Sequence, residues 1–157
     1  MKAVIVLSIV VMLLGIVAIA YGASPPKATG GVRFMRYDED DMEVLSFAEF
    51  QAHEGSGRRP AKGSIKFHDA LGYEFSADVT CVAVWGNYAT FSGPITKTNM
   101  EDWEGMWIQV WVHDGGTPGS AGDQIGGEFF DDEPECKPET KPEEWSPVIG
   151  GNLTVHP

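Results

Sequence analysis

Tryptophans alternate with hydrogen-bonding side chains along the segment Met106–His113. Because successive side chains of a β-strand point to opposite sides, an extended conformation separates this segment into two faces. The aromatic and polar face consists of Trp107, Gln109, Trp111 and His113. Indole rings beside hydrogen-bonding groups suit sugars, whose C–H faces pack on aromatic planes. The pattern is compatible with a ligand or carbohydrate platform, but two tryptophans spaced by two on a strand more often cover one end of a core or pack under a loop.

Two aspartates, Asp114 and Asp123, enclose a glycine-rich segment directly after this strand. Carboxylates and unhindered backbone carbonyls together supply the hard oxygen ligands that Ca²⁺ prefers. The sequence therefore predicts that any bound metal is calcium held at Asp114 and Asp123, with no other cofactor. The alternative is a turn in which both carboxylates accept hydrogen bonds from their own backbone.

Familiar catalytic patterns are incomplete in this chain. The segment His53–Gly57 ends in glycine where a zinc-protease helix needs its second histidine, and there is no Gly-x-Ser-x-Gly motif. The neighbours His68-Asp69 and His113-Asp114 point to opposite faces of a strand, so without a bend they cannot act as a base and its orienting group. We expect no enzyme. A small secreted hydrolase stays an alternative, because the spacing of two carboxylates depends on the tertiary structure.

The elements that position these residues are predicted by an alternation of apolar and polar side chains, which is clearest from Tyr73 to Val84. Turn-forming residues separate the strands, and Trp85-Gly86-Asn87 predicts a hairpin turn. Helical periodicity is missing, apart from one turn at most in Asn99–Glu104. The fold is therefore predicted to be all-β, an eight-strand, mainly antiparallel barrel or barrel-like sandwich. The seven further strands are expected near Gly31–Tyr37, Val44–Ala52, Gly63–His68, Tyr88–Gly93, Met106–His113, Gln124–Phe130 and Gly151–His156.

One long insertion, Asp131–Pro147, contains four prolines and seven acidic residues, which predicts an exposed loop. It also carries Cys136, one of two cysteines, the other being Cys81. In an exported chain this pair predicts a disulfide, with two unpaired thiols as the alternative. The bond would close a loop of about 56 residues and stabilise the fold by about 4 kcal/mol through chain entropy.

The N-terminal segment predicts export. Lys2 precedes an apolar run from Ala3 to Ala20, and Ala20-Tyr21-Gly22 resembles a cleavage site. We expect a signal peptide at 1–22, a tether at 23–27 and a single domain at 28–157, in a secreted or cell-surface protein. The alternative is an uncleaved anchor, in which case the protein would also contact the membrane.

The chain is acidic, with 11 basic and 23 acidic side chains and a net charge of -12. Loss of Lys2 with the signal peptide makes the charge of the mature chain −12 − 1 = −13. A nucleic acid would be repelled at long range by such a chain. We therefore expect an extracellular ligand or surface as the partner, and no nucleic acid.

Several short segments follow one another in a characteristic order along nearly all of the mature chain. They are Ala28–Gly31, Gly63–Asp69, Asp78–Val82, Gly86–Gly93, Val110–Ser120 with Asp123, and Gly150–His156. In this order and spacing they resemble a widespread, largely uncharacterised family of small secreted prokaryotic β-domains, found alone or appended to larger extracellular proteins. The resemblance implies an exported all-β module and no catalytic residues.

The sequence thus leads us to expect an exported, non-enzymatic β-domain that binds or displays, with the tryptophan strand as its contact surface. A carbohydrate-binding module and a passive structural domain are alternatives.

Overall fold

The computed structural model describes residues 24–38, 40–57, 59–116, 119 and 121–157, so the predicted signal peptide at 1–22 lies outside the described residues. The described chain forms nine β-strands and one short 3₁₀ turn, η1. Their bounds are β1 Lys27–Tyr37, β2 Glu43–His53, β3 Lys62–Asp69, β4 Glu74–Val79, β5 Cys81–Trp85, β6 Tyr88–Thr98, η1 Glu101–Trp103, β7 Trp107–His113, β8 Gln124–Phe130 and β9 Ser146–His156. Within the described residues, no helix is long and apolar enough to cross a membrane.

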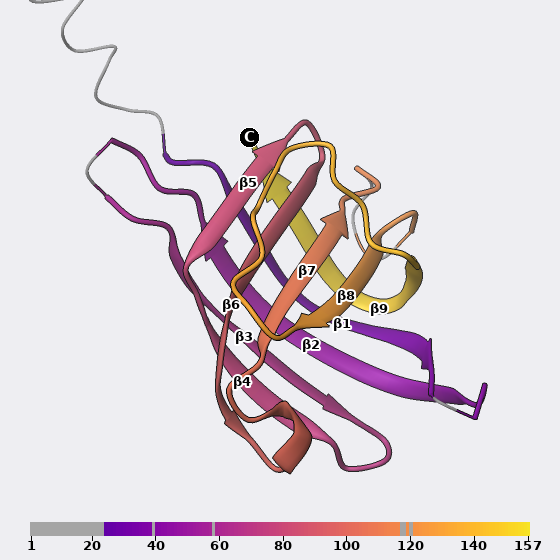
Figure 1. The fold of residues 1–157 in the computed structure, drawn as a ribbon. Helices are drawn as coiled ribbons and strands as arrows, with labels where there is room; N and C mark the ends of the chain where they lie inside the picture. Colours follow the sequence, from indigo (N-terminus) through magenta and orange to yellow (C-terminus); the bar gives the residue numbers. More distant parts are fainter. Residues whose placement is uncertain (1–23, 39, 58, 117–118, 120) are drawn as a thin grey trace, which may run out of the picture.

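Eight of the strands close into an antiparallel barrel with up-and-down connections (Figure 1). Neighbouring strands follow the order β4-β3-β2-β1-β9-β8-β7-β6, and the pairing of β4 with β6 closes the ring. The ninth strand, β5, continues the path of β4 and pairs with the first half of β6. The predicted all-β barrel is confirmed.

The strand expected from Tyr73 to Val84 is interrupted at Thr80, which is why nine strands form where eight were predicted. Before the break, alternate side chains of β4 enter the core as predicted. At the break the Thr80 N–H donates to the Ser92 carbonyl at 2.9 Å, and the chain packs so closely on Gly93 that a side chain there would collide with the Asp78 carbonyl. The alternation shifts by one residue, which leaves Cys81 outside the barrel.

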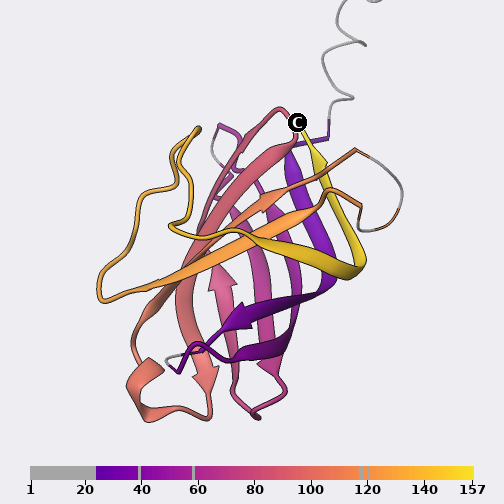
Figure 2. The same ribbon diagram turned by 90° about the vertical axis from the view of Figure 1, so that its right-hand side faces the viewer.

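Other differences concern the ends of elements. Strand β6 continues five residues past the predicted Gly93, to Thr98, and β9 begins at Ser146 rather than near Gly151. The early start of β9 shortens the insertion between strands to residues 131–145. This segment passes in front of β6 and β7 in Figure 1 and stands on the outside of the barrel in Figure 2.

The two ends of the barrel are filled differently. The end that carries the C-terminus, at the top of Figures 1 and 2, is packed by small and branched side chains around Phe50 and Phe91, whose rings lie 5.1 Å apart. The end that carries η1 and the β3–β4 hairpin lies at the bottom of both views. We call it the lower end, and there the interior is not completely filled.

Candidate functional site

The predicted tryptophan platform lies on the outer face of β7, opposite the inward-facing Ile108, Val110 and Val112. The structure brings all four predicted residues onto one face, as expected. Their exposure differs from that of an open platform, however: Trp111 is 4% exposed and Gln109 3% exposed. Trp107 and His113, at the two ends of the strand, are half-buried.

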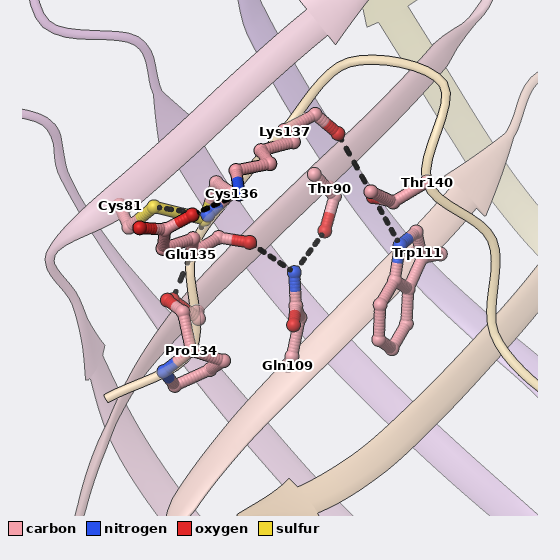
Figure 3. Close-up of a disulfide and its surroundings, with 10 residues drawn as sticks. Cys81, Thr90, Gln109, Trp111, Pro134, Glu135, Cys136, Lys137 and Thr140 are labelled. Atoms are coloured by element: carbon pink, nitrogen blue, oxygen red, sulfur yellow. Dashed lines mark hydrogen bonds and ion pairs between the residues drawn. A yellow bond between two sulfur atoms is a disulfide. The ribbon is translucent and has the colours of Figure 1, made fainter. Parts of the chain in front are cut away.

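The insertion at 131–145 covers this face, and Figure 3 shows its contacts. The Trp111 indole N–H donates to the Thr140 hydroxyl at 3.0 Å. The Gln109 amide donates to the Thr90 hydroxyl at 3.0 Å and to the Glu135 carbonyl at 3.3 Å. The segment predicted as an exposed loop is therefore also a cover, with charged residues facing solvent and backbone groups facing the barrel.

A disulfide between Cys81 and Cys136 fixes the cover to β5, as predicted, with Cα atoms 5.9 Å apart (Figure 3). A second point of close approach is Gly126, the register partner of Trp111 on β8. A Cβ at Gly126 would lie 2.5 Å from Cγ of the buried Pro142. The missing side chain of Gly126 thus makes room for the cover.

Aromatic rings at the edge of the cover complete an outer-face cluster. Tyr88 stacks on His113 with ring centroids 4.3 Å apart and on Trp85 at 5.9 Å, and Trp145 of the insertion meets Tyr88 edge-on at 6.4 Å. With Trp111, these four rings form what we call the covered cluster. Trp111 and Gln109 do not offer an open surface to a sugar, so a platform at this face stays a prediction that requires the cover to move.

The two predicted calcium ligands accept hydrogen bonds from backbone N–H groups. One Asp114 carboxylate oxygen accepts from Gly116 N–H at 2.8 Å and the other from Val155 N–H at 3.0 Å. Asp123, 1% exposed, accepts from Gly115 N–H at 2.8 Å, while its Oδ2 is buried without a hydrogen-bond partner among the described residues. No group of three or more acidic, histidine or cysteine side chains in the described ranges could hold a metal. Calcium binding at Asp114 and Asp123 stays a prediction.

A cavity of about 300 Å³ opens into the lower end of the barrel. Inward-facing side chains of β1, β3, β4, β7 and β8 form most of its walls. The lining residues are Phe34, Arg36, Tyr37, Ala48, Ile65, Phe67, Phe75, Trp103, Ile108, Val110, Ile125, Gly126, Gly127, Phe129, Glu144 and Ser146.

Four aromatic rings, which we call the open cluster, form one wall of this cavity. The Trp103 and Phe129 rings stack with centroids 4.9 Å apart, and each meets Phe75 edge-on, at 5.8 Å and 5.7 Å. Phe67 stacks on Phe75 at 5.1 Å. Phe129 is 37% exposed, which is unusual for a large aromatic ring that faces the inside of a barrel. The open cluster thus leaves aromatic surface accessible to a ligand.

The cavity opens because β8 and β1 diverge at the lower end. Strand β9 lies between them, but it pairs with β8 only at Gln124 and Ile125 and with β1 only as far as Phe34. The lower halves of β8 and β1 therefore have no strand between them. Gly127 faces this opening without a side chain and is exposed.

A partly buried ion pair lies beside the aromatic wall. Arg36 is two residues from the core residue Phe34 and therefore lies on the same face of β1. It reaches across β2 to Asp69 at the end of β3. The Asp69 side chain is fully buried, and its other oxygen accepts from the N–H groups of Leu71 and Tyr73 at 2.9 and 3.1 Å. Asp69 thus shapes the β3–β4 turn and holds Arg36 in place. The Arg36 Nε–H is buried and has no acceptor among the described residues.

Negative charge surrounds the mouth of the cavity. The Tyr37 hydroxyl donates to Glu43 at 3.2 Å, and this hydrogen bond, followed by the charges of Glu43 and Glu144, raises the pKa of Tyr37 above its ordinary value. Glu144 itself lines the cavity. A ligand that enters here passes acidic side chains before it reaches Arg36.

Sequence reasoning did not find this site, because its residues come from distant segments and none of them forms a motif. One local signal existed: Gly126-Gly127 within a strand pattern indicates a close approach or an opening. In the structure Gly126 is where the cover approaches closely, and Gly127 lies at the opening of the cavity. No family model, curated protein or solved structure matches this chain, so the geometry described above is what supports a function.

Proposed function

We propose that this protein is an exported, non-enzymatic binding module that holds a small, largely apolar molecule in the cavity at the lower end of the barrel. The observation that supports this most strongly is the cavity itself, about 300 Å³ with an aromatic wall and an open mouth. Binding sites for small molecules are concave and mostly apolar, with a few placed polar groups, and the mouths of β-barrels are a common location. The resemblance to secreted β-domains stays a prediction that agrees with this function.

Export is supported by the disulfide, because such bonds persist in oxidising compartments. A binding role rather than catalysis is supported by the ion pair of Arg36 and Asp69 beside the aromatic wall. Arginine stays protonated and cannot act as a base. The Asp69 carboxylate already accepts hydrogen bonds from two backbone N–H groups and is paired with Arg36. Neither side chain is therefore available as a general base or nucleophile.

The test is a fluorescence titration with dimethylnaphthylamine, an uncharged two-ring amine, against the mature domain. Gly127→Leu should place an apolar side chain in the mouth and weaken binding at least about tenfold. The substitution is compatible with the fold, since a Cβ at Gly127 would lie 3.7 Å from its nearest neighbours.

The matched control is Gly31→Leu, at an exposed strand glycine where nothing lies within 4 Å of an added Cβ and which does not line the cavity. It should bind like the wild type. No binding to the wild type, or equal binding to Gly127→Leu, would remove the cavity as the binding site.

A further inference from the structure

We infer that the cavity selects uncharged, planar apolar molecules that carry a hydrogen-bond acceptor, such as a carbonyl oxygen, to which the Arg36 Nε–H donates. This inference rests on the proposed function, because it names the class of ligand for the same cavity. It depends on three features of the lower end: an unpaired buried donor, the charge around it, and the shape of the aromatic wall.

The unpaired donor is the first feature. The Arg36 Nη2 pairs with Asp69, and its Nη1 is 3.4 Å from the Tyr37 carbonyl oxygen. The third nitrogen of the guanidinium, Nε, is buried and has no acceptor among the described residues. Buried polar groups in folded proteins nearly always have partners, so an orphaned donor that belongs to a cavity-lining side chain points to an acceptor supplied from outside.

The local charge is the second feature, and it disfavours an anion. Asp69 already balances the charge of Arg36, and Glu43 and Glu144 stand at the mouth. These four side chains carry +1 − 3 = −2 charges, and the whole chain carries -12. A carboxylate ligand would therefore be repelled on approach. A cationic head group is equally unsuitable at Nε, since it offers no acceptor and would lie beside the guanidinium.

The aromatic wall is the third feature, and it favours a flat ligand. Phe67, Phe75, Trp103 and Phe129 interact with one another in stacked and edge-on arrangements, and Phe129 leaves part of its surface open. A planar ring system continues such packing with its face or its edge. The volume of about 300 Å³ is at the small end of known ligand sites, which suits a ligand of two or three fused rings rather than a lipid chain.

The inference is tested with three related naphthalene probes and the wild-type mature domain. Dimethylnaphthylamine has no carbonyl, prodan adds a propionyl carbonyl to the same uncharged rings, and dimethylaminonaphthoate replaces that group by a carboxylate. Prodan should bind about tenfold more tightly than dimethylnaphthylamine, as expected for one hydrogen bond from a charged donor. The naphthoate should bind more weakly than prodan.

The contribution of Arg36 is isolated with Arg36→Met combined with Asp69→Asn, which removes every donor of the guanidinium, leaves no buried charge unpaired and keeps an oxygen for the N–H groups of Leu71 and Tyr73. Prodan and dimethylnaphthylamine should bind this variant equally. A measurement on the wild type does not depend on the variant's folding: the Arg36 Nε–H resonance, observed by NMR, should shift with prodan and stay in place with dimethylnaphthylamine.

The outcomes separate the inference from the proposed function. If dimethylnaphthylamine binds and Gly127→Leu blocks it, but the carbonyl adds nothing and the Arg36 Nε–H resonance does not move, the ligand class is wrong and the cavity remains. Tighter binding of the naphthoate than of prodan would also overturn the ligand class. If no probe binds the wild type, the proposed function fails as well.

Discussion

The covered cluster and the open cluster are both rich in aromatic rings, but the first lies on the outer face of the barrel and the second lines its interior at the lower end. On the outer face, Trp111 packs beneath the insertion and is 4% exposed. On the inner face at the lower end, Trp103 and Phe129 line a cavity that solvent reaches. Aromatic composition alone therefore does not identify a binding surface, because identical residue types stabilise the fold on one face and leave surface available on the other.

The difference between the two regions comes from what covers them. A disulfide and hydrogen bonds donated by the side chains of Gln109 and Trp111 hold residues 131–145 over the outer face. Over the cavity mouth, β8 and β1 diverge and Gly127 contributes no side chain. Substitutions in the covered cluster should therefore change stability, whereas substitutions in the open cluster should change binding.

Removal of the disulfide by Cys81→Ala with Cys136→Ala should have the largest effect on stability. The free energy of unfolding should fall by about 4 kcal/mol, because the unfolded chain regains the entropy of an open loop. Denaturant unfolding of the oxidised wild type and of the double variant measures the change. Where the variant is still folded, it should bind dimethylnaphthylamine like the wild type, since the cavity lies on the other face. A stability loss under 1 kcal/mol would show that the cover is held mainly by its other contacts.

Trp111→Ala and Trp103→Ala compare the two clusters directly. Trp111→Ala should cost about 3 kcal/mol, because it removes a buried indole and leaves the Thr140 hydroxyl without its donor. Trp103→Ala should cost about half as much, because Trp103 is half-buried. Probe binding should show the reverse order, with weaker binding only in Trp103→Ala. Chemical denaturation measures the loss of stability in each variant, and titration measures the loss of probe binding. If the same variant showed the larger loss in both experiments, the two clusters would not divide stability and binding between them.

The adjacent glycines of β8 allow a finer comparison. Gly126→Ala should destabilise the fold by about 2 kcal/mol, since its Cβ would meet Pro142 and Glu144 of the cover. Gly127→Ala should stay within about 0.5 kcal/mol of the wild type, since its Cβ meets only ordinary contacts. Thermal unfolding of both variants measures the difference. Equal losses would mean that a strand glycine is needed at both positions for reasons other than the cover.

Calcium should have the smallest effect. If Asp114 and Asp123 bind Ca²⁺, a concentration of about ten times Kd should stabilise the wild type by about 1.4 kcal/mol through mass action. Asp114→Asn with Asp123→Asn should remove this effect, because the amide oxygen that remains is a weaker ligand than a carboxylate. The melting temperature with and without calcium provides the measurement. The same shift in both proteins would indicate general screening of the acidic chain instead.

The sequence by itself determined the all-β class, the position of most strands and the disulfide. Alternation of apolar and polar residues is a local property, so it fixes which side chains of β4 or β7 share a face, whatever the rest of the chain does. The pairing of Cys81 with Cys136 followed from their being the two cysteines of the chain. Likewise the four residues of the predicted platform do share one face of β7.

Only the tertiary structure decided which aromatic face is open. Burial of Trp111 depends on Thr140 and Pro142, which come from a segment whose composition predicts solvent exposure. The cavity combines Arg36, Phe75 and Phe129 from strands that meet only when the barrel closes, and its mouth depends on where β9 stops pairing. Alternation places a side chain on a face but contains no information about what lies above that face. Contacts between segments distant in sequence supply that information, and they exist only in the folded chain.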